Sequence, residues 1–443
     1  MSSEKKSNKL TFSECYSTGF GMLVGSGIIS MTGIAIGYTG SGVWLAYILA
    51  GILCLVCNAP LFIATSFVPR TSGNYHSSLA ISTNMGGLFS YLYFFGSISI
   101  SFYGASFVSY FLSIVHTTID TRIISLGCLS IFFVLNIFGG KKVAKAQMIM
   151  NVFLAAAWIS FLILGFPKIR PENFTKANMF PNGINGLLEA TTMLVFAMGG
   201  GLWLTNSGGR IENPEKNIIK GNVLITGTGM VLFAVISVVA AGVLPISEVA
   251  GKPLTVVAQA IYPGNTYLFF VIGGALLALT TTMNASYLNM ANALYKTSQD
   301  GWFPAFMGKK NKYGVPYVLM TIVFVVSALP ILFGADTKIL SRMTTGFNYL
   351  TKLIPNLALM AIVAKFPAEW KASRYYMKKP VLTVFYVICN LTLVWLIYRN
   401  MRSFPVQMLP VVAALVIVFY IIARFRSKKV KEILVSQSQD AAE

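Results

Sequence analysis

Two short glycine-rich segments lie inside long apolar stretches of this sequence. GSG at residues 25–27 divides the apolar run of residues 13–37, and GGG at residues 199–201 divides the run of residues 186–206. Glycine is a poor helix former, so both runs are predicted to be helices that unwind near their middle. Inside a bilayer the freed N–H and C=O groups each cost several kcal/mol unless a polar partner satisfies them. The chemistry predicted here is the binding of a small polar ligand by backbone groups, with a carboxylate favoured at the start of the resumed helix.

Close helix packing is the alternative explanation for these glycines, because small residues let membrane helices approach one another. That alternative is the stronger one for GSG taken alone. The two segments, however, are five apolar runs apart, and an odd offset gives their spans opposite directions through the membrane. Glycine-interrupted segments in corresponding positions of two halves point to a transporter binding site. Together the two segments favour a site formed by broken helices.

The composition is that of a polytopic, all-α integral membrane protein. Of 443 residues, 55% are hydrophobic and 11% are charged, whereas soluble proteins carry about 25% charged residues. Mean hydropathy is +0.69. Apolar runs near the length that spans a bilayer recur throughout, with no soluble domain between them. Twelve transmembrane helices are predicted, at residues 13–37, 43–67, 88–115, 122–139, 146–166, 186–206, 219–244, 266–295, 316–334, 343–364, 381–398 and 405–424.

The net charge of +20 is distributed unevenly between the two sides of the predicted membrane. With the N-terminus inside, 24 of the 34 Lys and Arg residues lie in cytoplasmic segments. This bias predicts a multi-pass protein of the cell membrane with both termini cytoplasmic. No cleavable signal peptide is evident, since Lys5, Lys6 and Lys9 precede a first span that reads as a retained helix. The basic segment 424–431 is expected to meet anionic lipid headgroups and not nucleic acid.

Five segments in the expected order resemble the amino acid–polyamine–organocation (APC) transporter superfamily, over nearly the whole chain. GSGII at residues 25–29 is similar to the signature of its first span, and RIENPEKNI (210–218) to the Asn-Pro segment after its sixth. The other three are PRTSGNYHSS (69–78), FGGKKVAKAQ (138–147) and LNMANALYKTSQDGWFPAFMGKKNKYGVP (288–316).

The resemblance implies a five-plus-five inverted repeat with broken helices one and six, plus two additional helices. The repeats would be residues 13–166 and 186–364, followed by two helices within 381–424 and a cytoplasmic tail over 425–443. It also implies alternating access around a mid-membrane site for an amino acid or related amine. Helix one would hold the carboxylate and helix six the amino group. Carried over by motif, and by alignment with the arginine–agmatine antiporters of the family, the substrate-binding residues are Gly25, Ser26, Gly27, Ile28, Ser97, Ile100, Phe196, Gly199, Gly200, Gly201, Trp203 and Ser286.

The coupling mechanism is where this sequence departs from the family. Leu202 stands where many members have a glutamate, and Leu154 stands near the position of a lysine in some proton-coupled members. The hydroxyl run at residues 280–282 either supplies oxygen ligands to sodium or bonds back to its own helix. Symport, exchange and the coupling ion therefore stay open.

Lys352 is the charged residue placed well inside an apolar stretch. Such a charge is a functional candidate by default, and the alternative is a long stem that reaches the membrane interface. Glu14 and Glu189 lie near span ends and are expected to be interfacial. Cys54 and Cys57 form a CxxC within an apolar helix, where packing is favoured over a redox or metal pair.

The side chains of this sequence do not predict an enzyme. The chain has 2 His residues, both at loop edges, and no acid–base pair, nucleophile–base pair or metal cluster can be assembled. No catalytic residue, metal or cofactor is predicted. We predict a secondary active amino acid transporter, with a neutral substrate side chain favoured because no acidic residue lies near the expected pocket. The alternatives are an exchanger of basic amino acids or polyamines and a non-transporting amino acid sensor on the same fold. The oligomeric state is left open.

Overall fold

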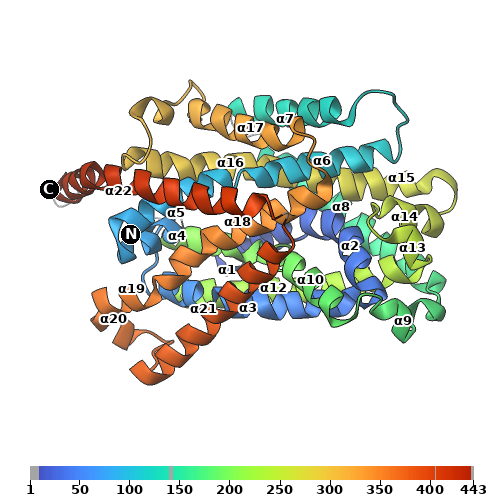
Figure 1. Cartoon of the computed structure of the whole chain (residues 1–443), viewed down its shortest axis with the longest axis horizontal. Coiled ribbons are helices and arrows are strands. Elements are labelled where there is room, and N and C mark those ends of the chain that lie inside the picture. Colours follow the sequence, from blue (N-terminus) through green and yellow to red (C-terminus); the bar gives the residue numbers. More distant parts are fainter. Residues whose placement is uncertain (1–8, 139–142, 405, 441–443) are drawn as a thin grey trace, which may run out of the picture.

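The computed structural model describes residues 9–138, 143–404 and 406–440. Within these residues the secondary structure is helical, with isolated backbone bridges joining Leu10 to Ile211 and Thr71 to Ser207. Most long helices lie side by side along the long axis of the molecule, and the described chain begins and ends at the same end of this bundle (Figure 1). In the described part of the chain, 8 helical stretches are long and apolar enough to cross a membrane: Gly27–Phe67, Thr83–Leu112, Gly183–Asn206, Pro214–Gly242, Gly264–Tyr287, Thr337–Lys365, Lys379–Arg402 and Met408–Ser436. Shorter apolar helices are Thr121–Ile137, Val152–Lys168 and Tyr317–Leu332.

The first apolar run forms two helices. α1 (Phe12–Leu23) begins with a capping box, in which the Thr11 hydroxyl accepts the Glu14 N–H and the Glu14 carboxylate accepts the Thr11 N–H. α2 (Ser26–Thr39) starts after Val24, with φ −79° and ψ 60°, and Gly25, with φ −126° and ψ −135°. Neither residue has helical backbone angles. The interruption therefore lies at the glycines that predicted it.

The sixth apolar run is also interrupted, and its interruption begins before the glycines. α10 (Gly183–Leu194) gives way to turns over residues 195–198, then to the 3-10 helix η5 (Gly199–Leu202) and the short α11 (Trp203–Asn206). In the turns, the Phe196 N–H donates to the Met193 carbonyl at 3.3 Å and the Gly199 N–H to the Phe196 carbonyl at 3.2 Å. These bonds span three residues instead of four, so the α-helical ladder is lost there.

Two long helices lie beside both interruptions. α3 (Val43–Phe67) packs along α12 (Pro214–Gly242), α1 packs against α12, and α2 packs against α10. Gly51 of α3 lies so close to α12 that a Cβ there would stand 3.0 Å from the Met230 side chain. The broken segments are thus supported by a pair of continuous helices.

The third apolar run contains an interruption that the glycine pattern did not predict. α5 (Thr83–Phe95) and α6 (Ile98–Leu112) are separated by a turn at Gly96 and Ser97. In the eighth run, the π-helical segment η8 (Phe270–Leu276) leads into α16 (Leu277–Gln299). The remaining described elements are η1 (Gly40–Gly42), α4 (Gly73–Ile81), α7 (Thr121–Ile137), α8 (Val143–Gly165), η3 (Phe166–Lys168), η4 (Pro171–Phe174), α9 (Lys176–Met179), η6 (Gly208–Arg210), α13 (Ile246–Val249), α14 (Thr255–Ile261), η7 (Gly264–Thr266), α15 (Tyr267–Phe269), η9 (Ala305–Gly308), α17 (Tyr317–Leu332), α18 (Thr337–Leu357), α19 (Leu359–Lys365), α20 (Pro367–Ala372), α21 (Lys379–Arg402) and α22 (Met408–Asp440).

α21 and α22 lie at the periphery. Only 28% of the most apolar part of α21 and 11% of that of α22 is buried inside the protein. Their exposed apolar side chains suit contact with lipid. α22 runs beyond the rest of the bundle (Figure 1), so residues 425–440, assigned to the tail in the sequence interpretation, continue this helix. Near its end, Val430 is buried beside Gly301.

Candidate functional site

The two helix interruptions lie against each other. A Cβ added to Gly27 would stand 2.8 Å from the Cβ of Ala197, which is in the turn after α10. A Cβ added to Gly200 would stand 2.3 Å from the Leu23 Cβ and 2.7 Å from the Gly19 carbonyl oxygen. Real side chains do not approach this closely, so the interrupted segments meet backbone to backbone. Residues far apart in the sequence thereby form one site.

Opposite ends of two half-helices contribute to this site. α2 starts here without a side-chain cap, and the first N–H groups of a helix have no partner within it. α10 ends here, and its last carbonyls carry the negative end of the helix dipole. An N-terminus favours a carboxylate and a C-terminus favours an ammonium group. The pair can therefore receive both charges of an amino acid.

Three of the four predicted residues of span one are buried at the start of α2. Gly25, Gly27 and Ile28 are all inaccessible, and the side chain of Ser26 lies outside what the structure describes. A Cβ on Gly25 would stand 2.5 Å from the Thr282 hydroxyl oxygen, which places α16 directly against the first interruption.

The predicted residues of span six divide into two groups. Phe196 and Gly199 are partly accessible, although most of their neighbours from residue 190 to residue 201 are buried. Gly200 and Gly201 instead face helices: Gly200 meets α1, and a Cβ on Gly201 would stand 2.7 Å from the Asn222 side chain. Their lack of a side chain is explained by packing, and their contact with substrate stays a prediction. Trp203 turns its indole N–H toward Gly19 of α1, and this donor has no hydrogen-bond partner among the residues that the structure describes.

The predicted residues of spans three and eight lie on helices that pack together. Ser97 and Ile100 are fully buried at the start of α6, and Ser286 is partly buried in α16, which contacts α6 and α2. The Ser97 hydroxyl has no hydrogen-bond partner among the described residues. A buried hydroxyl without a partner is costly, so this atom suits a polar ligand.

Two of the three hydroxyl groups at residues 280–282 of α16 donate to their own helix. Thr281 and Thr282 both donate to the carbonyl of Ala278, at 2.9 Å and 2.8 Å. Nor do the described residues include a group of His, Cys, Asp or Glu that could hold a metal ion. Cys54 and Cys57 are buried and free, which agrees with their interpretation as packing residues.

Lys352 of α18 lies beside the second interruption. Its side chain is buried, and its Nζ is 3.9 Å from the position that a Cβ on Gly199 would occupy. The sequence singled out this lysine as a charge within an apolar run, but its position next to the glycines of span six could not be predicted.

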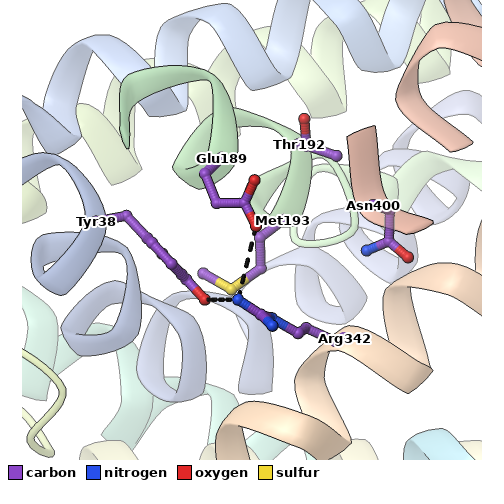
Figure 2. Close-up of a pocket in the computed structure, with 6 residues that line it drawn as sticks. All are labelled: Tyr38, Glu189, Thr192, Met193, Arg342 and Asn400. Atoms are coloured by element: carbon purple, nitrogen blue, oxygen red, sulfur yellow. Dashed lines mark hydrogen bonds and ion pairs between the residues drawn. The ribbon is translucent and has the colours of Figure 1, made fainter. Parts of the chain in front are cut away.

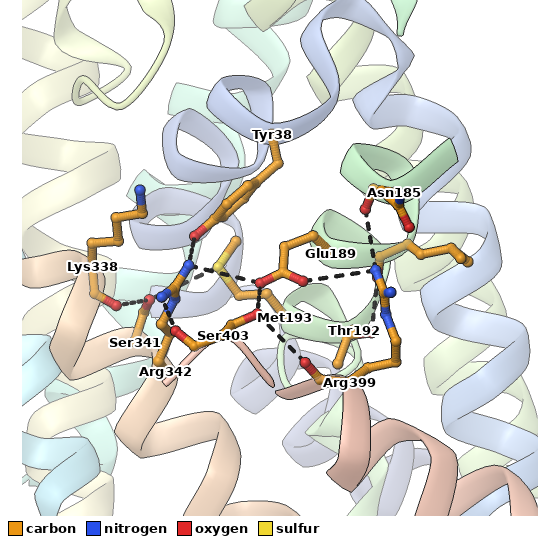
Figure 3. Close-up of polar contacts among 11 residues, drawn as sticks. Tyr38, Asn185, Glu189, Thr192, Met193, Lys338, Ser341, Arg342, Arg399 and Ser403 are labelled. Carbon is orange, nitrogen blue, oxygen red and sulfur yellow. Dashed lines mark hydrogen bonds and ion pairs between the residues drawn. The ribbon is translucent and has the colours of Figure 1, made fainter. Parts of the chain in front are cut away.

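A charged cluster, missed by the sequence analysis, joins the ends of four helices (Figure 3). The Glu189 carboxylate of α10 lies 3.7 Å from Arg342 Nη2 of α18 and 3.8 Å from Arg399 Nη2 of α21. Arg342 also donates to the hydroxyl of Tyr38, on α2, at 2.7 Å. The Ser403 hydroxyl, directly after α21, donates to Glu189. Glu189 was expected to be interfacial because it lies near the end of a predicted span, and its partners, more than a hundred residues away, could not be predicted.

Two cavities adjoin this cluster. A small one of about 10 Å³ is lined by Tyr38, Glu189, Thr192, Met193, Arg342 and Asn400 (Figure 2). A larger, open one of about 370 Å³ is lined by Tyr38, Asn182, Asn185, Gly186, Glu189, Arg399, Arg402 and Ser403. In the wall of the larger cavity, Arg399 and Arg402 accompany the single carboxylate of Glu189. This excess of positive charge favours anions there.

Comparison with known proteins agrees with these features. The amino acid permease family profile matches residues 10–423. An uncharacterised protein of Methanocaldococcus jannaschii is 26% identical over 75% of this chain and 77% of its own length. The branched-chain amino acid permease BcaP of Bacillus subtilis is 22% identical, covering 70% of this chain and 71% of itself. The gamma-aminobutyric acid permease of the same organism is 22% identical, with 93% and 92% covered.

The similarity extends over nearly the whole chain, including both interruptions and the helices around them. It identifies a multi-pass membrane protein of amino acid transport with a small-molecule substrate, and not an enzyme. The chain belongs to the amino acid permease family, within the APC superfamily.

Proposed function

We propose that this protein is a secondary active amino acid transporter that works by alternating access. The observation that carries the proposal is the contact between the two interruptions, Gly27 against Ala197 and Gly200 against Leu23. This contact brings the N-terminus of α2 and the C-terminus of α10 to one place. The α-carboxylate of the substrate would bind the first N–H groups of α2, and its ammonium the last carbonyls of α10.

The proposed architecture has twelve spans in a five-plus-five inverted repeat, with residues 13–166 and 186–364 as the repeats. The two interruptions in spans one and six support this arrangement. We also propose a cell-membrane location with both termini in the cytoplasm. The positive-inside bias and the common end at which the described chain begins and ends support that orientation (Figure 1).

The charged cluster around Glu189 has a place in this cycle. It ties α2 and α10, the half-helices that lead to the site, to α18 and α21. Alternating access requires one end of the site to open while the other is closed. We propose that the site opens on the side of Glu189 when the contacts of this residue break. The positively charged cavity beside these contacts would then be the path to the site.

Flux into proteoliposomes tests the proposal. A panel of labelled amino acids is presented to empty and to amino-acid-loaded vesicles, with and without proton and sodium gradients. Accumulation driven by one gradient identifies a symporter and its ion, and accumulation only into loaded vesicles identifies an exchanger. Amino-acid-dependent thermal stabilisation without flux would contradict transport and establish a sensor. Neither flux nor stabilisation would contradict the site itself.

A further inference from the structure

A polar stripe runs along the apolar helix α18. Thr344, Asn348, Lys352 and Asn356 recur every fourth residue, a spacing that places them along one face of a helix. Asn356 is satisfied: its amide donates to the Lys352 carbonyl at 2.9 Å and its oxygen accepts the Leu61 N–H at 3.2 Å. The hydroxyl of Thr344 and the side-chain oxygen of Asn348 are buried without a partner among the described residues. Two polar atoms of this stripe are therefore available to hydrogen-bond a ligand.

Lys352 is the charged member of this stripe, and only 6% of it is exposed. The described ion pairs join other residues: Lys296 to Asp300, and Glu189 to Arg342 and Arg399. The ionisable groups that interact electrostatically with Lys352 are the thiols of Cys54 and Cys57, not carboxylates. A buried ammonium without an anion is unfavourable. The described residues therefore leave the ammonium group of Lys352 without a negative group to balance its charge.

The location of Lys352 indicates where that negative group comes from. Its Nζ lies 3.9 Å from the Cβ position of Gly199, and Gly199 is one of the partly accessible residues of the second interruption. A substrate bound at this interruption would reach the ammonium. A substrate with a cationic side chain would be repelled there, because two like charges at this distance disfavour each other.

We infer that the protein carries amino acids with an acidic side chain, and that Lys352 binds the side-chain carboxylate. This inference rests on the proposed function, because it assumes that the interruptions hold the substrate. The N-terminus of α2 takes the α-carboxylate, which leaves Lys352 for the second one, with Asn348 and Thr344 on the same helix face. The positive cavity beside Glu189 would attract the same substrates.

Variants at Lys352 test the inference. Lys352→Met keeps an unbranched side chain that is one atom shorter and removes its charge, and Lys352→Arg keeps the charge. Lys365→Met is the matched control, because Lys365 is an exposed lysine at the end of α19. Each protein is purified, checked for a monodisperse folded state and reconstituted. Uptake and thermal stabilisation are measured with L-glutamate, L-aspartate and L-leucine.

The wild-type protein is expected to prefer L-glutamate or L-aspartate over L-leucine. Lys352→Met should weaken the apparent affinity for the acidic substrate by about thirty-fold or more, the usual consequence of truncating one partner of a buried charge pair. Its affinity for L-leucine should change far less. Lys352→Arg should retain part of the acidic preference, and Lys365→Met should behave as wild type.

Two results would overturn the role of Lys352 alone, and a third would overturn the proposed function as well. Uptake of L-leucine but not of the acidic amino acids, with the same profile in Lys352→Met, would leave the transporter proposal standing and remove the role of Lys352. An altered pH dependence of L-leucine uptake in Lys352→Met, without a change of selectivity, would give the lysine a role in proton coupling instead. Absence of binding and flux for all amino acids would contradict the proposed function itself.

Discussion

The carboxylate of Glu189 on α10 and the guanidinium of Arg342 on α18 lie 3.7 Å apart. Arg342 also donates to Tyr38 on α2. One guanidinium of α18 therefore contacts both half-helices, α2 of the first interrupted run and α10 of the sixth. The pair is partly buried, and both groups are also held by contacts to Ser403. This geometry makes the contact a structural tie whose removal can be measured.

Glu189→Gln is expected to destabilise the folded protein. The substitution leaves Arg342 and Arg399 without the carboxylate that lies between their charges. We expect the free energy of unfolding to decrease by about 2 kcal/mol. Thermal unfolding in detergent measures it as a lower melting temperature. Glu172→Gln is the matched control, because Glu172 is an exposed carboxylate in η4. Equal melting temperatures for the two variants would show that the tie contributes nothing.

Gly27→Val is expected to abolish substrate-dependent stabilisation. Its side chain would enter the contact with Ala197, where a Cβ alone would stand at 2.8 Å, and would push the two interruptions apart. Gly227→Val on α12 is the control, since a Cβ there meets nothing within 4 Å. Ligand-dependent shifts of melting temperature compare the two. A Gly27→Val protein that is folded and still stabilised by amino acid to the wild-type extent would contradict the site.

Gly200→Ala is expected to destabilise the folded protein even in the absence of ligand. Its Cβ would stand 2.3 Å from the Leu23 Cβ and 2.7 Å from the Gly19 carbonyl oxygen, and a backbone group cannot rotate away. Overpacking of this kind costs about 1–3 kcal/mol. The expected readout is a lower melting temperature without ligand, with Gly227→Ala as the control. A melting temperature equal to that of wild type would show that α1 moves aside.

His76 on α4 is expected to make the protein less stable in mild acid. Its burial, and then the charges of Arg70 and Lys296, lower its pKa from 6.5 to about 4. Between these values the unfolded chain binds a proton that the folded protein does not, so stability decreases as the pH falls from 6.5 toward 4. Because His76 is partly exposed, we expect the free energy of unfolding to decrease by only about 1 kcal/mol at pH 5.

Melting temperatures at pH 7.5 and pH 5 check this prediction for the wild-type protein and for His76→Gln. The variant lacks the buried imidazole of His76, so its melting temperature should fall less than that of the wild type. His116→Gln serves as the control, because His116 lies in an exposed loop. An equal fall in wild type and His76→Gln would assign the acid sensitivity to other groups.

The interruptions were predictable from sequence because glycine weakens a helix locally. Gly25 marked the first one correctly. The second begins at Val195, before the glycines, in a turn whose Ala197 packs against Gly27 of α2, a contact that local sequence does not reveal. The turn at Gly96 and Ser97 was missed for a related reason: a single glycine in a membrane helix usually signals only close packing.

The long-range parts of the site were beyond the reach of the sequence. Glu189 meets Arg342 and Arg399 only because three separate helices converge. Lys352 could be recognised as a buried charge, since a lysine within an apolar run is rare. Its neighbour Gly199 is 153 residues away, and no spacing rule connects two such positions. Periodicity and composition predict elements, whereas contacts between elements require the fold.

The length of α22 has a consequence for the lipid environment. Its 33 residues extend about 50 Å, and the hydrocarbon layer of a bilayer is about 30 Å thick. We expect the excess to place the basic segment 424–431 in the layer of phosphate headgroups. Val430 and Ile433 lie against Gly301, just after α16. α16 also borders the first interruption at Gly25. These contacts form a continuous path from α22 through α16 to the first interruption. We expect turnover to respond to the fraction of anionic phospholipid in the vesicle.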